Sequence, residues 1–180
     1  MNLRGSNTEK NLLEAFSGES QARNKYSYFA SQARKEGYEQ IGQIFDEIAA
    51  NEKEHAKIWF KLLNGGSISQ TTDNLRAAME GEEFEYQQMY PNFASEAEKE
   101  GFNEIAELFR SVAAIEKTHK EEYELLLDNI LHNKVFVRDD KVTWKCRNCG
   151  YEITDTRAPT GACPVCKHGV AYFELKKSNY

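Results

Sequence analysis

The sequence has 180 residues, of which 40% are hydrophobic and 29% are charged, and this composition is typical of a soluble globular protein. Its formal net charge of −6 argues against nucleic-acid binding, and no apolar run approaches the ~20 residues that would cross a membrane. All four cysteines lie in two C-x-x-C pairs, and residues 1–4 lead into polar sequence without a secretory signal. These features predict a reducing compartment, with the cytoplasm as the default location.

Residues 1–134 contain an internal repeat, in which the second copy follows the first at an offset of 64 residues. Phe29-Ala30-Ser31 matches Phe93-Ala94-Ser95 at this offset, and the segment 49–55 matches the segment 113–119. Two copies are too few to stack as a solenoid, so each copy is expected to form one helical hairpin. The two hairpins together predict a four-helix bundle.

The expected helices cover about residues 7–37, 39–64, 72–101 and 103–132. The first should begin after a capping box, Ser6-x-x-Glu9. Gly37 and Gly101 separate the two helices of each hairpin, which predicts antiparallel neighbours.

The second copy holds one residue more than the first between Gly81 and Phe93. A helix can absorb such an insertion as a π-bulge, which is common at functional sites. Pro91 follows, and we expect it to kink the helix.

Each copy carries one Glu-x-x-His motif, Glu52/His55 in the first and Glu116/His119 in the second. Residues three apart share a helix face, so both side chains of a motif can bind the same metal ion. A single motif would be read as a chance pair on a solvated face. Two motifs at equivalent positions, among apolar neighbours, predict a di-iron or di-manganese site inside the bundle.

The partner helices of the two hairpins supply further carboxylates. Glu19 is the candidate in the first copy, and the strict offset would pair it with Glu83. Glu82 and Glu85 are preferred, because they lie three residues apart and can both point inward. Such an oxygen-rich set suits iron or manganese better than a structural zinc ion. The expected ligands are Glu19, Glu52, His55, Glu82, Glu85, Glu116 and His119.

The link between the hairpins, residues 64–71, is short. For Glu52 and Glu82 to share a site, the chain must travel roughly 30 Å along the bundle between the two helices. Eight or nine extended residues reach about 30 Å at most. The link is then either taut or unable to close within one chain. We expect a domain-swapped homodimer, in which each site takes Glu19, Glu52 and His55 from one subunit and its other four ligands from the second subunit.

The tail, residues 135–180, contains two short strand-like runs, 135–137 and 142–144, and two C-x-x-C pairs thirteen residues apart. Four thiolates at this spacing predict a tetrahedral site for iron or zinc, and a zinc ribbon that only holds the tail together is the alternative. Lys167 stands where a glycine would suit the second metal-binding turn, and His168 is expected at the surface. The four ligands are Cys146, Cys149, Cys163 and Cys166.

Taken together, these stretches resemble the rubrerythrin family over nearly the whole chain. The motifs that carry the resemblance include Gly81-Glu82-Glu83-Phe84-Glu85-Tyr86, Met89-Tyr90-Pro91 and Cys146-Arg147-Asn148-Cys149-Gly150-Tyr151. The resemblance implies a mainly α fold, with a ferritin-like four-helix bundle over residues 1–134 and a small β-rich rubredoxin-like domain over 135–180. It also implies a non-haem di-iron centre and a mononuclear Fe(Cys)4 centre, for which zinc could substitute, and it favours Glu82 and Glu85 over Glu83.

The activity implied by the resemblance is the reduction of hydrogen peroxide to water, as a defence against oxidative stress. Glu85 and His55 would be catalytic, because in similar proteins one iron exchanges a glutamate for a histidine with its oxidation state. The thiolate-bound iron would relay electrons from an external donor, such as a rubredoxin or an NAD(P)H-dependent reductase. No dinucleotide-binding fingerprint is found, so NADH itself is not expected to bind. Tyr26 and Tyr90 are candidates either to hydrogen-bond a ligand carboxylate or to pack in an aromatic core.

Three other functions are compatible with parts of the pattern. The bundle ligands alone would allow ferritin-like iron oxidation and storage, but a storage shell has no need of a thiolate relay. A non-enzymatic module with zinc in the tail is the second alternative. A di-iron oxygenase is the third, although no pattern of an organic-substrate pocket is found.

Overall fold

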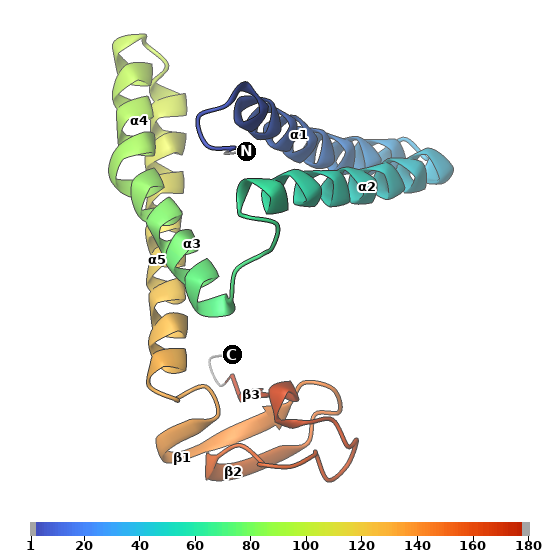
Figure 1. Cartoon of the computed structure of the whole chain (residues 1–180), viewed down its shortest axis with the longest axis vertical. Helices are drawn as coiled ribbons and strands as arrows, with labels where there is room; N and C mark the ends of the chain where they lie inside the picture. The colour runs from blue at the N-terminus through green and yellow to red at the C-terminus, as the bar shows by residue number, and fades with distance from the viewer. Residues whose placement is uncertain (1–2, 178–180) are drawn as a thin grey trace. The chain divides into compact units, whose positions relative to one another are not determined.

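The computed structural model describes residues 3–177 and is mainly helical, with a small C-terminal β-sheet (Figure 1). The chain divides into two compact units, Met1–Ser69 and Gln70–Tyr180. Two short segments lie outside the described residues, 1–2 and 178–180. The first begins the segment expected to lack a secretory signal, and the second ends the expected tail domain. Among the helices described, none is long and apolar enough to cross a membrane.

The first unit is a helical hairpin made by α1 (Asn7–Lys35) and α2 (Glu39–Leu63). Ser6 caps α1, because its Oγ accepts a hydrogen bond from the Glu9 backbone N–H at 3.1 Å. The Glu9 carboxylate in turn accepts a hydrogen bond from the Gly5 backbone N–H at 2.6 Å. The expected capping box therefore forms, with Gly5 in place of Ser6 as the backbone donor to Glu9. Gly37, at φ +86°, adopts the left-handed conformation that ends α1.

Small side chains set the distance between the two helices of the first hairpin. A Cβ added to Gly42 would lie 2.9 Å from the Arg34 Cγ and 3.1 Å from the Ala30 carbonyl oxygen, so the backbones approach closely there. The second hairpin has a corresponding cluster of small buried residues packed against Phe109. The buried small residues of both hairpins are Ala30, Ala33, Gly42, Ala49, Ala56, Ala94, Ala97 and Ala106.

The second unit begins with helices α3 (Thr71–Phe84), η1 (Glu85–Met89), α4 (Tyr90–Lys99) and α5 (Asn103–Leu131). The first three follow one another along the length of α5 (Figure 1). The π-helix η1 confirms the prediction that the extra residue is absorbed as a π-bulge, and the Tyr90 backbone N–H donates to the Glu85 carbonyl five residues earlier. Pro91 lies in the first turn of α4, where a proline is tolerated.

The two hairpins carry the same ion pair with the charges reversed. In the first, Arg34 Nη2 lies 2.6 Å from Asp46 Oδ2. In the second, Arg110 Nη2 lies 2.6 Å from Glu98 Oε1. Residues 34 and 98, like 46 and 110, are 64 positions apart, so the repeat conserves the bond between helices while exchanging its donor and acceptor.

The tail forms a three-stranded antiparallel sheet in the order β2-β1-β3, with β1 (Val137–Cys146), β2 (Glu152–Arg157) and β3 (Phe173–Leu175). Of the first strand-like run expected from the sequence, 135–137, only Val137 belongs to β1. The second run, 142–144, lies in the same strand, because β1 continues through an irregularity between Val137 and Val142. The core of the sheet is formed by Trp144, Cys146, Ala158, Cys163 and Phe173.

Candidate metal centres

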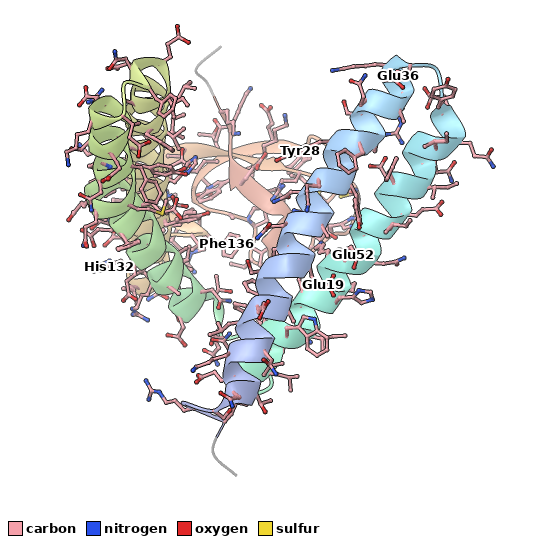
Figure 2. All side chains as sticks on the ribbon, turned by 90° about the horizontal axis from the view of Figure 1, so that it is seen from above. Glu19, Tyr28, Glu36, Glu52, His132 and Phe136 are labelled. Atoms are coloured by element: carbon pink, nitrogen blue, oxygen red, sulfur yellow. The ribbon has the colours of Figure 1, made fainter. Side chains whose placement is uncertain are left out.

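Two helices bring the first group of expected ligands together. Glu19 comes from α1, Glu52 and His55 come from α2, and one donor atom from each lies within 4.8 Å of the others. His55 Nδ1 is 2.9 Å from Glu52 Oε2 and 3.9 Å from Glu19 Oε1. Figure 2 shows Glu19 and Glu52 next to each other on neighbouring helices. The side chains of Glu19 and Glu52 retain 29% and 17% of their exposure, so both are largely withdrawn from water.

The second hairpin repeats this arrangement. Glu82 comes from α3, Glu116 and His119 come from α5, and their donor atoms also lie within 4.8 Å of one another. His119 Nδ1 is 2.6 Å from Glu116 Oε2 and 3.7 Å from Glu82 Oε2. Each hairpin therefore carries one half-site, which consists of two carboxylates and one imidazole.

The charges of each half-site fit a bound cation. A hydrogen bond with Glu52 raises the pKa of Glu19, and burial followed by a hydrogen bond with Glu116 raises the pKa of Glu82. Two carboxylates this close repel each other when both are ionised, so the ionised pair carries an electrostatic cost in the absence of a cation. A divalent metal ion removes that cost and finds oxygen and nitrogen donors already gathered.

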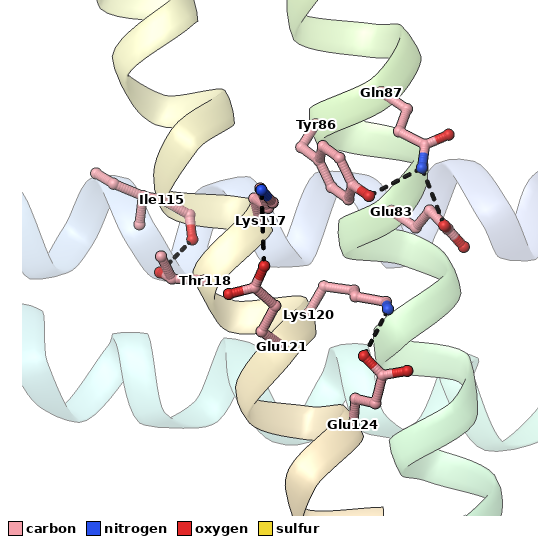
Figure 3. A network of polar contacts seen from close by, with 9 residues as sticks. All are labelled: Glu83, Tyr86, Gln87, Ile115, Lys117, Thr118, Lys120, Glu121 and Glu124. Atoms are coloured by element: carbon pink, nitrogen blue, oxygen red, sulfur yellow. Dashed lines mark hydrogen bonds and ion pairs between the residues drawn. The ribbon is translucent and has the colours of Figure 1, made fainter.

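The structure also distinguishes between Glu82 and Glu83, the two candidate ligands that the 64-residue repeat offset left open. Glu82 lies in the second half-site, whereas Glu83 is exposed and its Oε1 accepts a hydrogen bond from Gln87 Nε2 at 3.0 Å (Figure 3). Glu85 opens η1 and is half-buried, outside the group of donor atoms that lie within 4.8 Å. Burial, and then a hydrogen bond with Glu116, are the main causes that raise the pKa of Glu82, and the charge of Glu85 adds a smaller contribution in the same direction.

The two candidate tyrosines belong to matching aromatic groups. Tyr26 packs against Phe29 and Phe45, each with ring centroids 6.2 Å from its own. Burial, and then the charges of Glu85, Glu116 and Glu82, raise the pKa of Tyr90. Aromatic packing is thus observed for both, and their hydrogen bonds to ligand carboxylates stay a prediction. The second group, equivalent to the first by the repeat, is Tyr90, Phe93 and Phe109.

Trp59 is a functional candidate that the sequence analysis missed. Its Nε1–H is buried and has no hydrogen-bond partner among the described residues. The same N–H nevertheless acts on Glu19 and opposes part of the rise in its pKa. A signal was present in the sequence, because Trp59 lies four residues after His55 and seven after Glu52, on the same face of α2.

The four cysteines of the tail converge, with all four Sγ atoms within 4.8 Å of one another and no disulfide between them. The Cys146 and Cys166 sulfurs lie 3.6 Å apart, as do those of Cys149 and Cys163. A tetrahedral metal with ~2.3 Å bonds to sulfur requires about 3.7 Å between ligands, so these distances fit an M(Cys)4 centre.

Two similar turns hold the cysteines. The backbone N–H of Gly150 donates to the Cys146 carbonyl, and that of Lys167 donates to the Cys163 carbonyl, both at 2.9 Å. Both residues have positive φ, +78° for Gly150 and +63° for Lys167. The second turn therefore forms without a glycine.

The thiols of this site differ in acidity. The His168 backbone N–H, followed by smaller contributions that include neighbouring thiols, lowers the pKa of Cys166 to about 5. The Tyr151 backbone N–H acts in the same direction on Cys149, but burial and three neighbouring cysteines outweigh it and raise the pKa of Cys149 to about 12. Four thiolates thus form together only around a cation, which is the chemistry of an M(Cys)4 site.

Comparison with known proteins agrees with this geometry. The family model described as Rubrerythrin matches residues 10–127, and the one described as Rubrerythrin, rubredoxin-like domain matches residues 144–174. The chain belongs to the rubrerythrin family. As in that family, a ferritin-like helical part is followed by a rubredoxin-like domain, with Glu/His groups for a di-iron centre and four cysteines for a mononuclear iron centre.

Similarity to individual rubrerythrins extends over the full chain. The Rubrerythrin of Porphyromonas gingivalis is 50% identical, and the alignment covers 99% of this chain and 94% of the relative. The Rubrerythrin of Nitratidesulfovibrio vulgaris is 47% identical, with 99% and 98% covered. Rubrerythrin-1 of Clostridium acetobutylicum is 46% identical, with the same coverage.

Proposed function

We propose that this chain is a non-haem di-iron peroxidase that reduces hydrogen peroxide to water, with electrons relayed through its Fe(Cys)4 centre. The observation that carries this proposal is the presence, in one chain, of two matching Glu/His half-sites and a four-cysteine site. Bound iron would supply the two electrons that cleave the O–O bond of peroxide, and two protons complete the reaction to two water molecules.

The protein would hold the two irons with seven side chains. Glu19, Glu52 and His55 belong to the first half-site, and Glu82, Glu116 and His119 belong to the second. Glu85 would be the seventh ligand, and we propose that it alternates with His55 as a donor to one iron. Two features support this exchange: Glu85 begins a π-turn, and the His55 side chain keeps 51% of its exposure.

The chain would receive electrons through the rubredoxin-like domain. Cys149 is the exposed member of the four cysteines, so a donor protein can approach that side of the centre. We propose that the external donor is a protein such as a rubredoxin or an NAD(P)H-dependent reductase. We also propose that the chain assembles as a homodimer. Its location would be the reducing cytoplasm, which keeps the four thiols unoxidised. The division into a bundle domain, 1–134, and a tail domain, 135–180, is part of the same proposal.

Single-turnover spectroscopy tests the activity. The iron-loaded protein is reduced anaerobically, peroxide is added, and the visible absorption of the ferric thiolate centre is followed. We expect rapid re-oxidation in the native chain and in Glu83→Ala, whose side chain lies outside the half-site. Glu85→Ala and His55→Ala should slow re-oxidation by at least ~10²-fold, as expected when a group used in the reaction is lost. Undiminished turnover in both variants would exclude the assigned roles.

Metal analysis separates this proposal from its rivals. Iron near three per chain supports the peroxidase, whereas zinc in both centres supports a non-enzymatic module. Large hollow assemblies detected by light scattering would favour ferritin-like storage. The four-cysteine centre weighs against storage, because a storage shell needs no single-electron relay.

A further inference from the structure

We propose that a cleft between the end of α5 and the sheet of the tail binds an amphipathic carboxylate, which is a small molecule with one carboxylate group and an apolar body. The cleft lies within the second unit, where α5 leads into β1 (Figure 1), and has a volume of about 590 Å³. The residues that line it include none of the candidate metal ligands. Binding at this cleft goes beyond the proposed peroxidase and does not depend on it.

Arg138, near the start of β1, supplies the charged group of the cleft. Its Nη1 donates a hydrogen bond to Asn129 Oδ1 at 2.8 Å, which ties the guanidinium to the end of α5. Its Nε–H is buried, and no acceptor for it is found among residues 3–177. Buried donors in folded proteins nearly always have a partner, so this one indicates an acceptor that the described part of the chain does not supply.

The charges of the cleft favour one anionic group. Arg147 also lines the cleft, but its Nε lies 3.5 Å from Glu174 Oε2, so these two charges offset each other. In the part of the chain that the structure describes, Arg138 forms no ion pair with a carboxylate. One guanidinium charge in the cleft therefore has no counter-charge there.

A carboxylate matches this arginine better than a phosphate does. A guanidinium presents its N–H groups as a planar fork, and Nε with the adjacent Nη2 forms one edge that a carboxylate can meet with both oxygens. The Nη1 of Arg138 is already bonded to Asn129. A phosphate dianion would bring a second negative charge, and Arg147 is not free to neutralise it because it is paired with Glu174.

Apolar side chains form most of the remaining wall and call for an apolar body on the ligand. Leu126, Val135 and Leu175 line the cleft and are 51%, 39% and 37% exposed, and Phe136 lies beside them in the lining. Apolar walls around a few polar groups, in a volume of roughly 300–1,000 Å³, are the usual make-up of a pocket for a small organic ligand. An inorganic anion would leave these side chains in contact with water.

Water is the competing acceptor for the Arg138 Nε–H. A bound water is stable where roughly two to four polar groups surround it. In this cleft the Asn129 amide oxygen is already engaged, and leucine and valine side chains occupy the nearby wall. A carboxylate with an apolar body satisfies the donor and covers the wall at once.

Isothermal titration calorimetry on the full-length, iron-loaded protein tests the binding. The probe is octanoate, which joins a carboxylate to an alkyl chain. Octanamide keeps the chain but is neutral, and acetate keeps the charge but has almost no apolar part. We expect octanoate to bind at one site per chain and each of the other two to bind at least ~10-fold more weakly, because each lacks one of the two interactions. Equal affinity for octanoate and octanamide, or no octanoate binding at millimolar concentration, would overturn the proposal.

Two substitutions locate the octanoate in the cleft. Arg138→Gln removes the charge and the Nε–H, and Leu126→Glu places a fixed carboxylate on a half-exposed wall position while it keeps the arginine. Each should weaken octanoate binding at least ~10-fold. Leu125→Glu is the matched control, because Leu125 is the neighbouring exposed leucine and is not among the residues that line the cleft. Arg157→Gln controls for the loss of an exposed arginine on β2, and both controls should bind octanoate like the native chain.

The fold and the activity are checked separately from the binding. The ferric thiolate absorption shows that the tail is intact in each variant, and far-ultraviolet circular dichroism shows the same for the helices. Native octanoate affinity in both cleft variants, or an equal loss in the two controls, would place the octanoate elsewhere and overturn the proposal. The readout is binding, so a chain without peroxide turnover would still bind octanoate at the cleft.

Discussion

His119 Nδ1 lies 2.6 Å from the Oε2 of Glu116, one helical turn earlier on α5. This hydrogen bond, together with the charge of Glu116, raises the pKa of His119 above its ordinary value. A metal ion requires the neutral imidazole, so the same contact that places the ring also makes it hold its proton longer. Metal binding at the second half-site therefore competes with protonation of this ring.

Metal affinity should rise with pH. Protonated His119 competes with the metal, and because its pKa is raised, the competition persists to a higher pH than for a free histidine. Titration of the metal-free protein with Mn²⁺ should show tighter binding at about pH 8 than at about pH 6, with proton release measured in weakly buffered solution. Binding in Glu116→Gln should be weaker but less dependent on pH. Equal affinity at both pH values in the native chain would contradict the role of this pair.

Removing one acid of a half-site should stabilise the metal-free protein. The pKa of Glu19 is raised in the fold, so its contribution to stability is full below its ordinary pKa and is lost as the pH rises through the raised value. At pH 7, Glu19→Gln should therefore raise the melting temperature of the metal-free protein and lower that of the iron-loaded protein. The difference in the metal-free protein should vanish near about pH 4. Glu36→Gln, on an exposed position at the end of the same hairpin (Figure 2), should change neither.

Trp59 should position Glu19 for the metal. Its buried Nε1–H has no hydrogen-bond partner among the described residues and acts on the Glu19 carboxyl. Trp59→Phe keeps an aromatic ring but removes the donor, and we expect it to weaken metal binding by about 10-fold, a typical loss when a group that supports a ligand is removed. Calorimetry of Mn²⁺ binding measures this, and far-ultraviolet circular dichroism checks that the helices are intact. Native affinity in the variant would show that the indole only packs.

The π-helix should be required for the second half-site. Deletion of Gln88 removes the extra residue and rotates the helix before it by ~100° relative to the helix after it. With the Tyr90 group still packed on α5, Glu82 and Glu85 would turn away from Glu116. We expect loss of the iron pair with a normal Fe(Cys)4 spectrum, because the tail is untouched. Deletion of Ser69 from the link serves as the control and should leave iron pairing intact.

Much of the candidate site could be predicted because its ligands follow short-range rules. Glu-x-x-His places two ligands on one helix face, and C-x-x-C places two thiols in one turn, whatever surrounds them. The π-helix was predictable for a similar reason, since one extra residue between matched segments of a repeat must be absorbed locally.

Other features depend on packing between distant residues and left no comparable pattern. The role of Trp59 depends on the approach of α1 to α2, which brings its N–H to Glu19. The prediction of two strands was wrong, because β1 joins Val137 to the run 142–144 through a polar segment of low strand preference, and pairing with β2 on both sides of that segment holds it in one strand. Lys167 adopts a left-handed φ of +63°, against the preference of the residue itself, in the turn where its backbone N–H donates to the Cys163 carbonyl at 2.9 Å.

From its sequence alone, this protein was determined to be a duplicated helical hairpin with a four-cysteine tail, because periodicity and motif spacing are local properties of a chain. Only the tertiary structure decided that Glu85 stays outside the gathered donor atoms and that the buried Trp59 N–H acts on Glu19. These outcomes depend on where helices begin and end and on how closely they pack, and both are settled by contacts between residues far apart in the sequence.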